Sequence, residues 1–138
     1  MRVLFLTSPA MLNTWWPTVA ELIRPVVDEA AKGEFTLPDL ERMCRDGRAY
    51  AGVVLGEDGP QLGIVFQFKH YPQKMNAHVT AVGGKEMEAA AVSFWPTFRE
   101  WCKESGATEI EAWTSPAMTR MLSRIGFMKA YDVVRMPC

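Results

Sequence analysis

The sequence has almost no net charge, few histidines and no long hydrophobic run, and each shortage excludes a class of protein. Its 15 Lys and Arg residues nearly balance 16 Asp and Glu residues, so the net charge is −1. Binding to nucleic acid or to an anionic membrane surface depends on an excess of basic residues. We therefore expect neither partner. No apolar run approaches the ~20 residues that a membrane-spanning helix needs.

Cysteine and histidine are too sparse for a metal cluster or a disulfide framework. The chain has three cysteines and two histidines, and Cys44, Cys102 and Cys138 are not spaced as metal ligands. We expect reduced thiols in a cytoplasmic protein and no metal. The sequence also lacks a phosphate-binding Walker loop, a Gly-x-Ser-x-Gly motif and a His-Glu-x-x-His motif.

The composition is that of a globular protein. Of 138 residues, 49% are hydrophobic and 22% are charged, which is typical of a chain with a packed core. This length predicts a single domain over residues 1–138.

Hydrophobic periodicity predicts alternating strands and helices in the order β-α-α-β-β-β-α-β-α-β. We expect strands over residues 2–7, 50–55, 62–69, 74–82, 108–113 and 127–136, and helices over residues 12–30, 37–46, 87–102 and 116–125. Short turns join the second, third and fourth strands, which predicts an antiparallel meander. A long helix separates the fourth and fifth strands, so these two should be parallel. The fold class is α/β (α+β), with a mixed, mostly antiparallel sheet flanked by helices.

Two helices carry recognisable start signals. Asn13 or Thr14 can cap the first helix, and Pro25 should kink or divide it. In the second helix, Thr36 and Asp39 have the spacing of a capping box. Two sets of tryptophans fall at helical spacing and are most simply explained as core residues, namely Trp15 with Trp16 and Trp95 with Trp101.

The rest of the chain is organised around the stretch from Asn76 to Ala91. A β-branched, alternating run ends at Gly83-Gly84, and an amphipathic helix pattern follows directly. Backbone amides at such a junction, at the positive end of a helix, suit a phosphate or pyrophosphate. A glycine pair that only closes a turn is the simpler alternative. The residues that would form the cradle are Val82, Gly83, Gly84, Lys85, Glu86 and Met87.

The order of elements resembles the core of the GNAT (Gcn5-related N-acetyltransferase) superfamily over nearly the whole chain. Leu122-Ser-Arg-Ile-Gly-Phe127 is similar to the signature in which a Gly-Phe pair follows the last helix. Three further segments, Tyr71–Lys74, Val82–Met87 and Phe94–Trp101, resemble a subgroup of small GNAT-like proteins, many from tailed bacteriophages.

The resemblance implies acetyl-CoA as a substrate, with its pyrophosphate on the amides after the central strand. The sequence departs from the family at two places. The family's loop reads Gln/Arg-x-x-Gly-x-Gly/Ala, whereas this chain has adjacent glycines followed by Lys85. Many members place a tyrosine, which protonates the leaving thiolate, where this chain has Leu122. The asparagine that often precedes that helix corresponds to Ser115.

Acetylation of an amine needs a base, and two residues are candidates. His78 lies on the central predicted strand, and Glu111 lies on its parallel neighbour. A histidine that bonds to a neighbouring carbonyl is the alternative for His78. A solvated strand face is the alternative for Glu109 and Glu111. We expect Tyr71, in a turn, to be a surface residue.

Two hypotheses remain open at the level of sequence. The first is an acetyl-CoA-binding N-acetyltransferase that acts on an amine, either a small molecule or a protein. The second is a catalytically inactive GNAT-like protein with a binding or virion-assembly role in a bacteriophage, located in the host cytoplasm or the virion. The resemblance implies a homodimer or phage structural proteins as partners.

Overall fold

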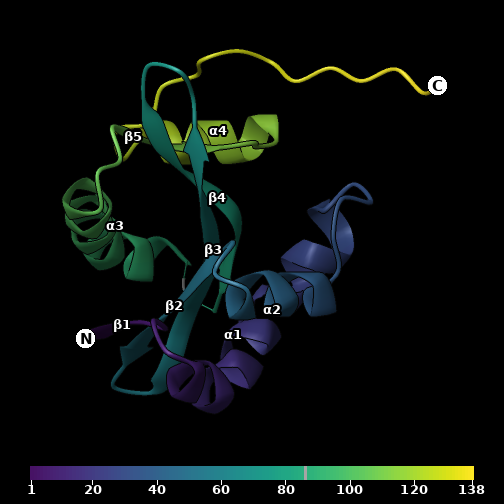
Figure 1. Ribbon diagram of the computed structural model, residues 1–138. Helices are drawn as coiled ribbons and strands as arrows, with labels where there is room; N and C mark the ends of the chain where they lie inside the picture. The colour runs from purple at the N-terminus through teal and green to yellow at the C-terminus, as the bar shows by residue number, and fades with distance from the viewer. Residues whose placement is uncertain (86) are drawn as a thin grey trace.

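A five-stranded sheet runs through the middle of the molecule, in the spatial order β1-β2-β3-β4-β5 (Figure 1). The computed structural model describes residues 1–85 and 87–138. Its strands are β1 (Arg2–Phe5), β2 (Tyr50–Gly56), β3 (Gly59–His70), β4 (Met75–Gly84) and β5 (Glu109–Ala112). Strands β1 to β4 are antiparallel, and β5 is parallel to β4. The predicted meander and parallel crossover are both confirmed.

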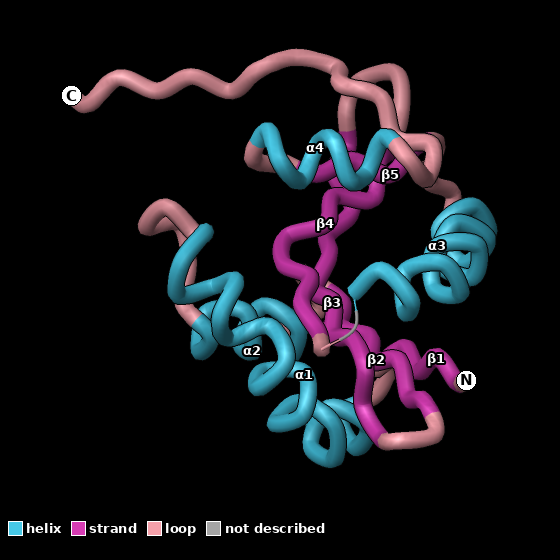
Figure 2. Tube along the Cα trace, turned by 180° about the vertical axis from the view of Figure 1, so that it is seen from behind, coloured by secondary structure: helices cyan, strands magenta, loops and turns pink. Residues whose placement is uncertain are grey.

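Helices cover both faces of this sheet. They are α1 (Pro9–Ala30), α2 (Leu37–Arg45), α3 (Met87–Glu104) and α4 (Pro116–Ser123). Helices α1 and α2 lie on one side and α3 on the other, which is plain when the two opposite views are compared (Figures 1 and 2). No helix in the described part of the chain is long and apolar enough to cross a membrane.

Each face of the sheet buries its own hydrophobic cluster. On the α1 side, Val19 and Ile23 pack against strand residues such as Val65. On the α3 side, Phe94 and Phe98 stack with ring centroids 5.2 Å apart and are fully buried with residues of β3 and β4. The four tryptophans at helical spacing belong to these layers, as predicted: Trp16 and Trp95 are buried, and Trp15 and Trp101 are partly buried against the clusters. Trp113, which follows β5, is half exposed.

The first helix begins earlier than the sequence indicated. Its cap is Ser8, whose hydroxyl accepts a hydrogen bond from the Met11 amide at 3.2 Å, and Pro9 occupies the first turn. A proline fits there because its missing N–H would have no helical partner. Pro25 does not divide α1, which continues to Ala30. The capping box of Thr36 and Asp39 in α2 is confirmed.

The last predicted strand, residues 127–136, is not formed. Phe127 packs on Trp95 with ring centroids 5.4 Å apart, and its amide bonds to the Leu122 carbonyl. Beyond it the chain has no regular secondary structure and its large apolar side chains, such as Val134, are exposed. The apolar residues of this segment are not enough for a strand, because a strand also needs a neighbour for its backbone groups. We call residues 128–138 the tail.

Candidate functional site

Strands β4 and β5 pair over a short distance and then separate. Their register runs from Asn76 opposite Glu109 to Val79 opposite Ala112, where β5 ends. On the other edge of β4, the register with β3 shifts at this point: Val79 faces Phe66, but Ala81 faces Val65. Thr80 is therefore the extra residue of a bulge. A bulge bends its strand and increases its twist, so β4 turns away from β5 here.

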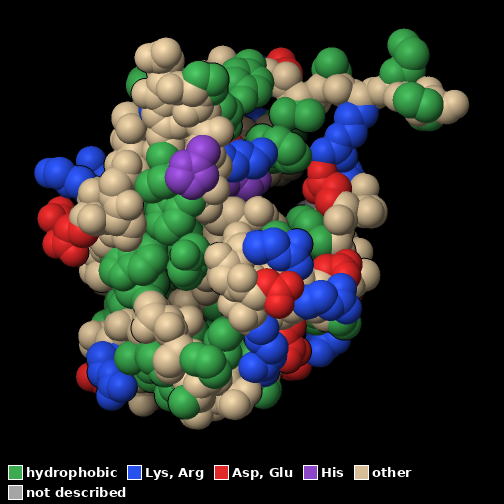
Figure 3. Space-filling view, in the orientation of Figure 1, with side chains coloured by type: hydrophobic (Ala, Val, Ile, Leu, Met, Phe, Trp, Pro, Cys, Tyr) green, Lys and Arg blue, Asp and Glu red, His purple; other side chains and the backbone are tan. Residues whose placement is uncertain are grey.

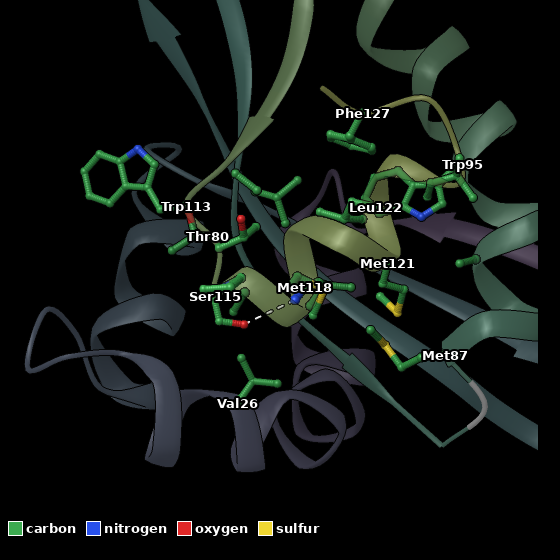
Figure 4. Close-up of a pocket in the computed structure, with 18 of the residues that line it drawn as sticks. Val26, Thr80, Met87, Trp95, Trp113, Ser115, Met118, Met121, Leu122 and Phe127 are labelled. Atoms are coloured by element: carbon green, nitrogen blue, oxygen red, sulfur yellow. Dashed lines mark hydrogen bonds between the residues drawn. The ribbon is translucent and has the colours of Figure 1, made fainter. Parts of the chain in front are cut away.

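The separation opens a groove of about 840 Å³ between β4, α3, α4 and the end of α1 (Figure 4). Its walls are mostly apolar, with hydroxyl groups at Thr80, Thr114 and Ser115. The apolar lining includes Val82, Met87, Trp95, Met118 and Leu122. This volume lies within the ~300–1,000 Å³ that is usual for small-molecule and cofactor sites.

One wall of the groove offers backbone groups. Between Thr80 and Gly84, strand β4 continues to pair with β3, while the described chain provides no strand for its other edge. Alternate N–H and C=O groups along such an edge lack partners and can bond to an extended ligand. The groove therefore combines apolar walls with a ready-made row of donors and acceptors.

The glycine pair lies inside β4, not in a loop after it. A Cβ atom on Gly83 would lie 2.6 Å from the backbone oxygen of Leu22 in α1, and one on Gly84 would lie 2.1 Å from that of Gln61 in β3. Contacts this short do not occur, so both positions require glycine for the close approach of neighbouring backbone. Packing alone accounts for the pair.

The other residues of the predicted cradle differ in their positions and contacts. The Lys85 amide donates to the Gln61 carbonyl at 3.0 Å and is therefore already used. Val82 and Met87 line the groove, and Glu86 lies outside the described residues. The first amides of α3, from Met87 onwards, are the ones that a helix start leaves without helical partners. With the exposed side chain of Lys85 nearby in sequence, they are the groups suited to an anion.

The two predicted base candidates lie side by side at the point where the strands separate. His78 and Glu111 are opposite each other in the parallel register, so their side chains share the α1-facing side of the sheet. Nδ1 of His78 lies 2.9 Å from Oε2 of Glu111. The imidazole is buried, with 8% of its side chain exposed. His78 meets a carboxylate instead of a neighbouring carbonyl, and Glu111 is mostly shielded from solvent. The solvated strand face describes Glu109 alone, which is exposed.

Glu111 is held by further hydrogen bonds. Tyr71 Oη donates to its Oε1 at 2.7 Å, and Asn76 Nδ2 donates to the same oxygen at 2.9 Å. Partial burial alone would raise the pKa of Glu111. Hydrogen bonds from His78, Tyr71 and Asn76 outweigh that effect, so the pKa lies below its ordinary value. The hydrogen bond to Glu111 also raises the pKa of Tyr71 to about 12.

An ionised Glu111 determines which nitrogen of His78 carries the proton. A carboxylate only accepts hydrogen bonds, so Nδ1 of His78 is the donor and Nε2 of the neutral ring keeps a lone pair. His78 also lines a smaller pocket of about 240 Å³, together with Thr80 and Trp113. Several residues line both cavities, namely Val26, Glu34, Val79, Thr80 and Trp113. The imidazole thus lies in the smaller pocket, next to residues that line both cavities.

Other chemistries have no support in the described part of the chain. Burial raises the pKa of Cys44 and of Cys102 to about 12, which keeps both thiols protonated and unreactive. No group of three or more His, Cys, Asp or Glu side chains among the described residues could hold a metal ion.

Sequence reasoning missed two residues of the site. Tyr71 is 38% exposed, in keeping with a turn residue, but its hydroxyl reaches Glu111. Trp113 follows β5, and its ring lies edge-on to the His78 ring with centroids 5.0 Å apart. Only the strand register, which no local pattern reveals, brings these residues to the histidine.

Leu122 lies in α4, is buried and lines the groove. Ser115 caps the same helix, where its hydroxyl accepts a hydrogen bond from the Met118 amide (Figure 4). The side chain at position 122 thus faces the same cavity as Met87 and Trp95 but has no proton to give.

Comparison with known proteins identifies the fold. No protein-family model matches the sequence, and no curated protein matches it. Solved structures do match along the full chain. A probable acetyltransferase is 15% identical, with a TM-score of 0.74 and coverage of 100% of this chain and 98% of that one. A possible acetyltransferase from Clostridium difficile 630 is 8% identical, with a TM-score of 0.71 and coverage of 100% and 99%.

A third match is an aminoglycoside acetyltransferase from an uncultured soil metagenomic sample, solved in complex with sisomicin. It is 14% identical, with a TM-score of 0.66 and coverage of 99% of this chain and 94% of that one. Identities this low show the fold alone. The chain has the GNAT acetyltransferase fold, as the resemblance predicted.

The packing explanation of the glycine pair predicts a loss of stability without any ligand. Gly83→Ala should lower the free energy of unfolding by about 1–3 kcal/mol, because the methyl group forces α1 away from β4. Urea unfolding of the ligand-free protein measures this loss. An unchanged stability would contradict the packing role and return the pair to the cofactor loop.

The hydrogen bonds to Glu111 predict a dependence of stability on pH. Because its pKa is lowered in the folded state, the carboxylate stabilises the fold fully above its ordinary pKa and stops doing so as the pH falls through the lowered value. Glu111→Gln should therefore cost about 1–3 kcal/mol at pH 7, and the difference from wild type should vanish on acidification.

Urea titrations between pH 7 and pH 3 measure this difference, with Glu104→Gln at the exposed end of α3 as the control. An effect of Glu111→Gln that stays constant with pH would show that the carboxylate charge is not involved.

Proposed function

We propose that the protein is an acetyl-CoA-dependent N-acetyltransferase. The observation that carries the proposal is the His78–Glu111 pair, 2.9 Å apart, at the point where β4 and β5 separate into the groove. A positioned base beside a cavity of cofactor size is the minimum that transfer to an amine requires.

The groove suits acetyl-CoA, which would supply an activated acetyl group. The free edge of β4 offers backbone bonds to an extended amide-containing chain, and Val82 and Met87 offer apolar contact. The first turn of α3 and the side chain of Lys85 would hold the phosphates. Gly83 and Gly84 contribute by letting β4 approach α1 and β3, not by binding the anion themselves.

His78 is assigned the role of general base. An acceptor amine is mostly protonated at neutral pH, with a pKa of about 10.4 for a lysine-like group, and must lose a proton before it attacks. Nε2 of His78 can take that proton directly or through a water molecule. Glu111 keeps the ring in the required tautomer and stabilises the imidazolium that forms. Tyr71 and Asn76 hold the carboxylate in place.

Release of the thiolate proceeds without the family's usual acid. Leu122 occupies that position and donates nothing. A thiol has a pKa of about 8.5, so its anion is a fair leaving group near neutral pH. The missing acid, worth about 10²–10⁴ in rate where one is present, should make this a slow transferase.

The acceptor is an amine. A structural neighbour that is an aminoglycoside acetyltransferase, solved in complex with sisomicin, supports a small-molecule amine as the acceptor. The adjoining smaller pocket, which His78 lines together with Glu34, is the natural place for such a molecule.

A second candidate is a non-catalytic GNAT-fold protein with a binding or assembly role, for example in a bacteriophage particle. Two observations favour it: Leu122 replaces the acid, and packing alone explains the glycine pair. Such a protein would bind no acetyl-CoA, or would bind it without turnover.

Binding of CoA is the first prediction of the proposed function. CoA at ~100 times its dissociation constant should add about 2.7 kcal/mol to the free energy of unfolding, which raises the melting temperature by roughly 5–10 °C for a chain of this size. Lys85→Ala should weaken binding about two- to fivefold, whereas Lys103→Ala, at the far end of α3, should not. No shift at millimolar CoA would contradict the proposal.

Loss of the base is the second prediction. His78→Gln should lower kcat by about 10²–10⁴ and leave the affinity for acetyl-CoA unchanged, because the histidine acts on the acceptor. Steady-state assays with a panel of amines, together with calorimetric titration of acetyl-CoA, separate these quantities. Full activity in His78→Gln would assign the base elsewhere.

A further inference from the structure

The tail returns to the groove even though it has no regular secondary structure. Val133 and Arg135 line the groove. The Arg135 guanidinium forms an ion pair with Glu34, which follows α1, and lies 5.8 Å from the ring centroid of Trp113. Figure 3 shows the hollow beneath the tail, bridged at its edge by a basic side chain from the tail and an acidic side chain of the body.

Glu34 and Trp113 together form a position for a cation. A carboxylate gives charge-assisted hydrogen bonds, and an aromatic face attracts a positive group. Both side chains are partly exposed, at 30% for Glu34 and 49% for Trp113. The ring also carries the Lys69 ammonium, 4.4 Å from its centroid. Two cationic side chains of the protein, Lys69 and Arg135, therefore lie against this ring.

The same two residues border the catalytic candidate. Glu34, Trp113 and His78 all line the smaller pocket, and the His78 ring lies edge-on to Trp113. A molecule with one charged group at Glu34 can therefore extend toward the imidazole within one cavity.

We propose that Glu34 and Trp113 bind a second positive charge of the acceptor, and that Arg135 of the tail occupies this position in the free protein. This inference rests on the proposed function and narrows its substrate to small molecules with at least two ammonium groups. One group is held at Glu34, and the other reaches the base at His78. Arg135 acts as an internal competitor.

The contact of the tail is suited to displacement. The side chain of Arg135 is half exposed, and that of Glu34 is 30% exposed. Exposed ion pairs of this kind favour the paired state by about fivefold at most. A ligand that competes with Arg135 binds only those molecules in which Arg135 has left Glu34. Its apparent affinity is therefore its intrinsic affinity multiplied by the fraction of such molecules.

Calorimetric titration of 1,5-diaminopentane in the absence of acetyl-CoA tests the proposal directly. Arg135→Gln should tighten binding roughly two- to fivefold, and adding Glu34→Gln to the Arg135→Gln variant should weaken binding by about fivefold. In the Glu34→Gln background, Arg135→Gln should have no further effect, because both changes act on one ion pair. Lys129→Gln is the matched control, since this tail cation pairs with Asp132 and not with Glu34.

The uncharged 1,5-pentanediol should not bind. The proposal is overturned if the diol binds as well as the diamine, if the diamine binds neither wild type nor Arg135→Gln, or if adding Glu34→Gln to Arg135→Gln leaves binding unchanged. An unchanged affinity in Arg135→Gln would overturn the role of the tail. The titration contains no acetyl-CoA and therefore measures binding alone. If the diamine binds as predicted but is not acetylated in a separate assay with acetyl-CoA, the proposed function alone is contradicted.

Discussion

The separation of β4 from β5 is the feature on which the rest of the site depends. The two strands pair only from Asn76 to Val79, and the bulge at Thr80 then turns β4 away. The paired part holds His78 against Glu111. The unpaired part leaves a strand edge and a groove directly beside that pair. One irregularity in the sheet therefore produces both the candidate cofactor site and the position of the candidate base.

The glycine pair at the end of β4 allows this arrangement through its packing against α1 and β3. Because Gly83 and Gly84 have no side chains, α1 and β3 approach β4 closely, which fixes the strand edge that borders the groove. This packing explains why the two glycines are adjacent here and do not follow the spacing of the GNAT loop. The glycines serve packing, and in the proposed function the first turn of α3 and Lys85 would bind the anion. Substitution of either glycine would lower the stability of the fold whether or not a ligand is bound.

Much of this molecule could be predicted from local patterns, and the exceptions share a cause. Periodicity predicted the meander, the crossover and the capping box at Thr36, and residue type and strand face were enough to select His78 and Glu111 as candidates. Their 2.9 Å contact, the bond from Tyr71 and the bulge at Thr80 depend on register between strands, which no local pattern contains. The last strand was predicted wrongly for the same reason, since the described part of the chain offers this segment no neighbouring strand to pair with. The tail contact with Glu34 joins residues 101 positions apart in sequence.

The central claim is that acetyl-CoA lies along the free edge of β4. Titration of the ¹⁵N-labelled protein with acetyl-CoA, followed by amide chemical shifts, tests it most directly. The account predicts the largest changes at Thr80, Val82 and Met87, with smaller ones in α4 around Met118, and little change in α2. The absence of shifts at millimolar acetyl-CoA, or shifts confined to α2 and the far side of α1, would contradict it.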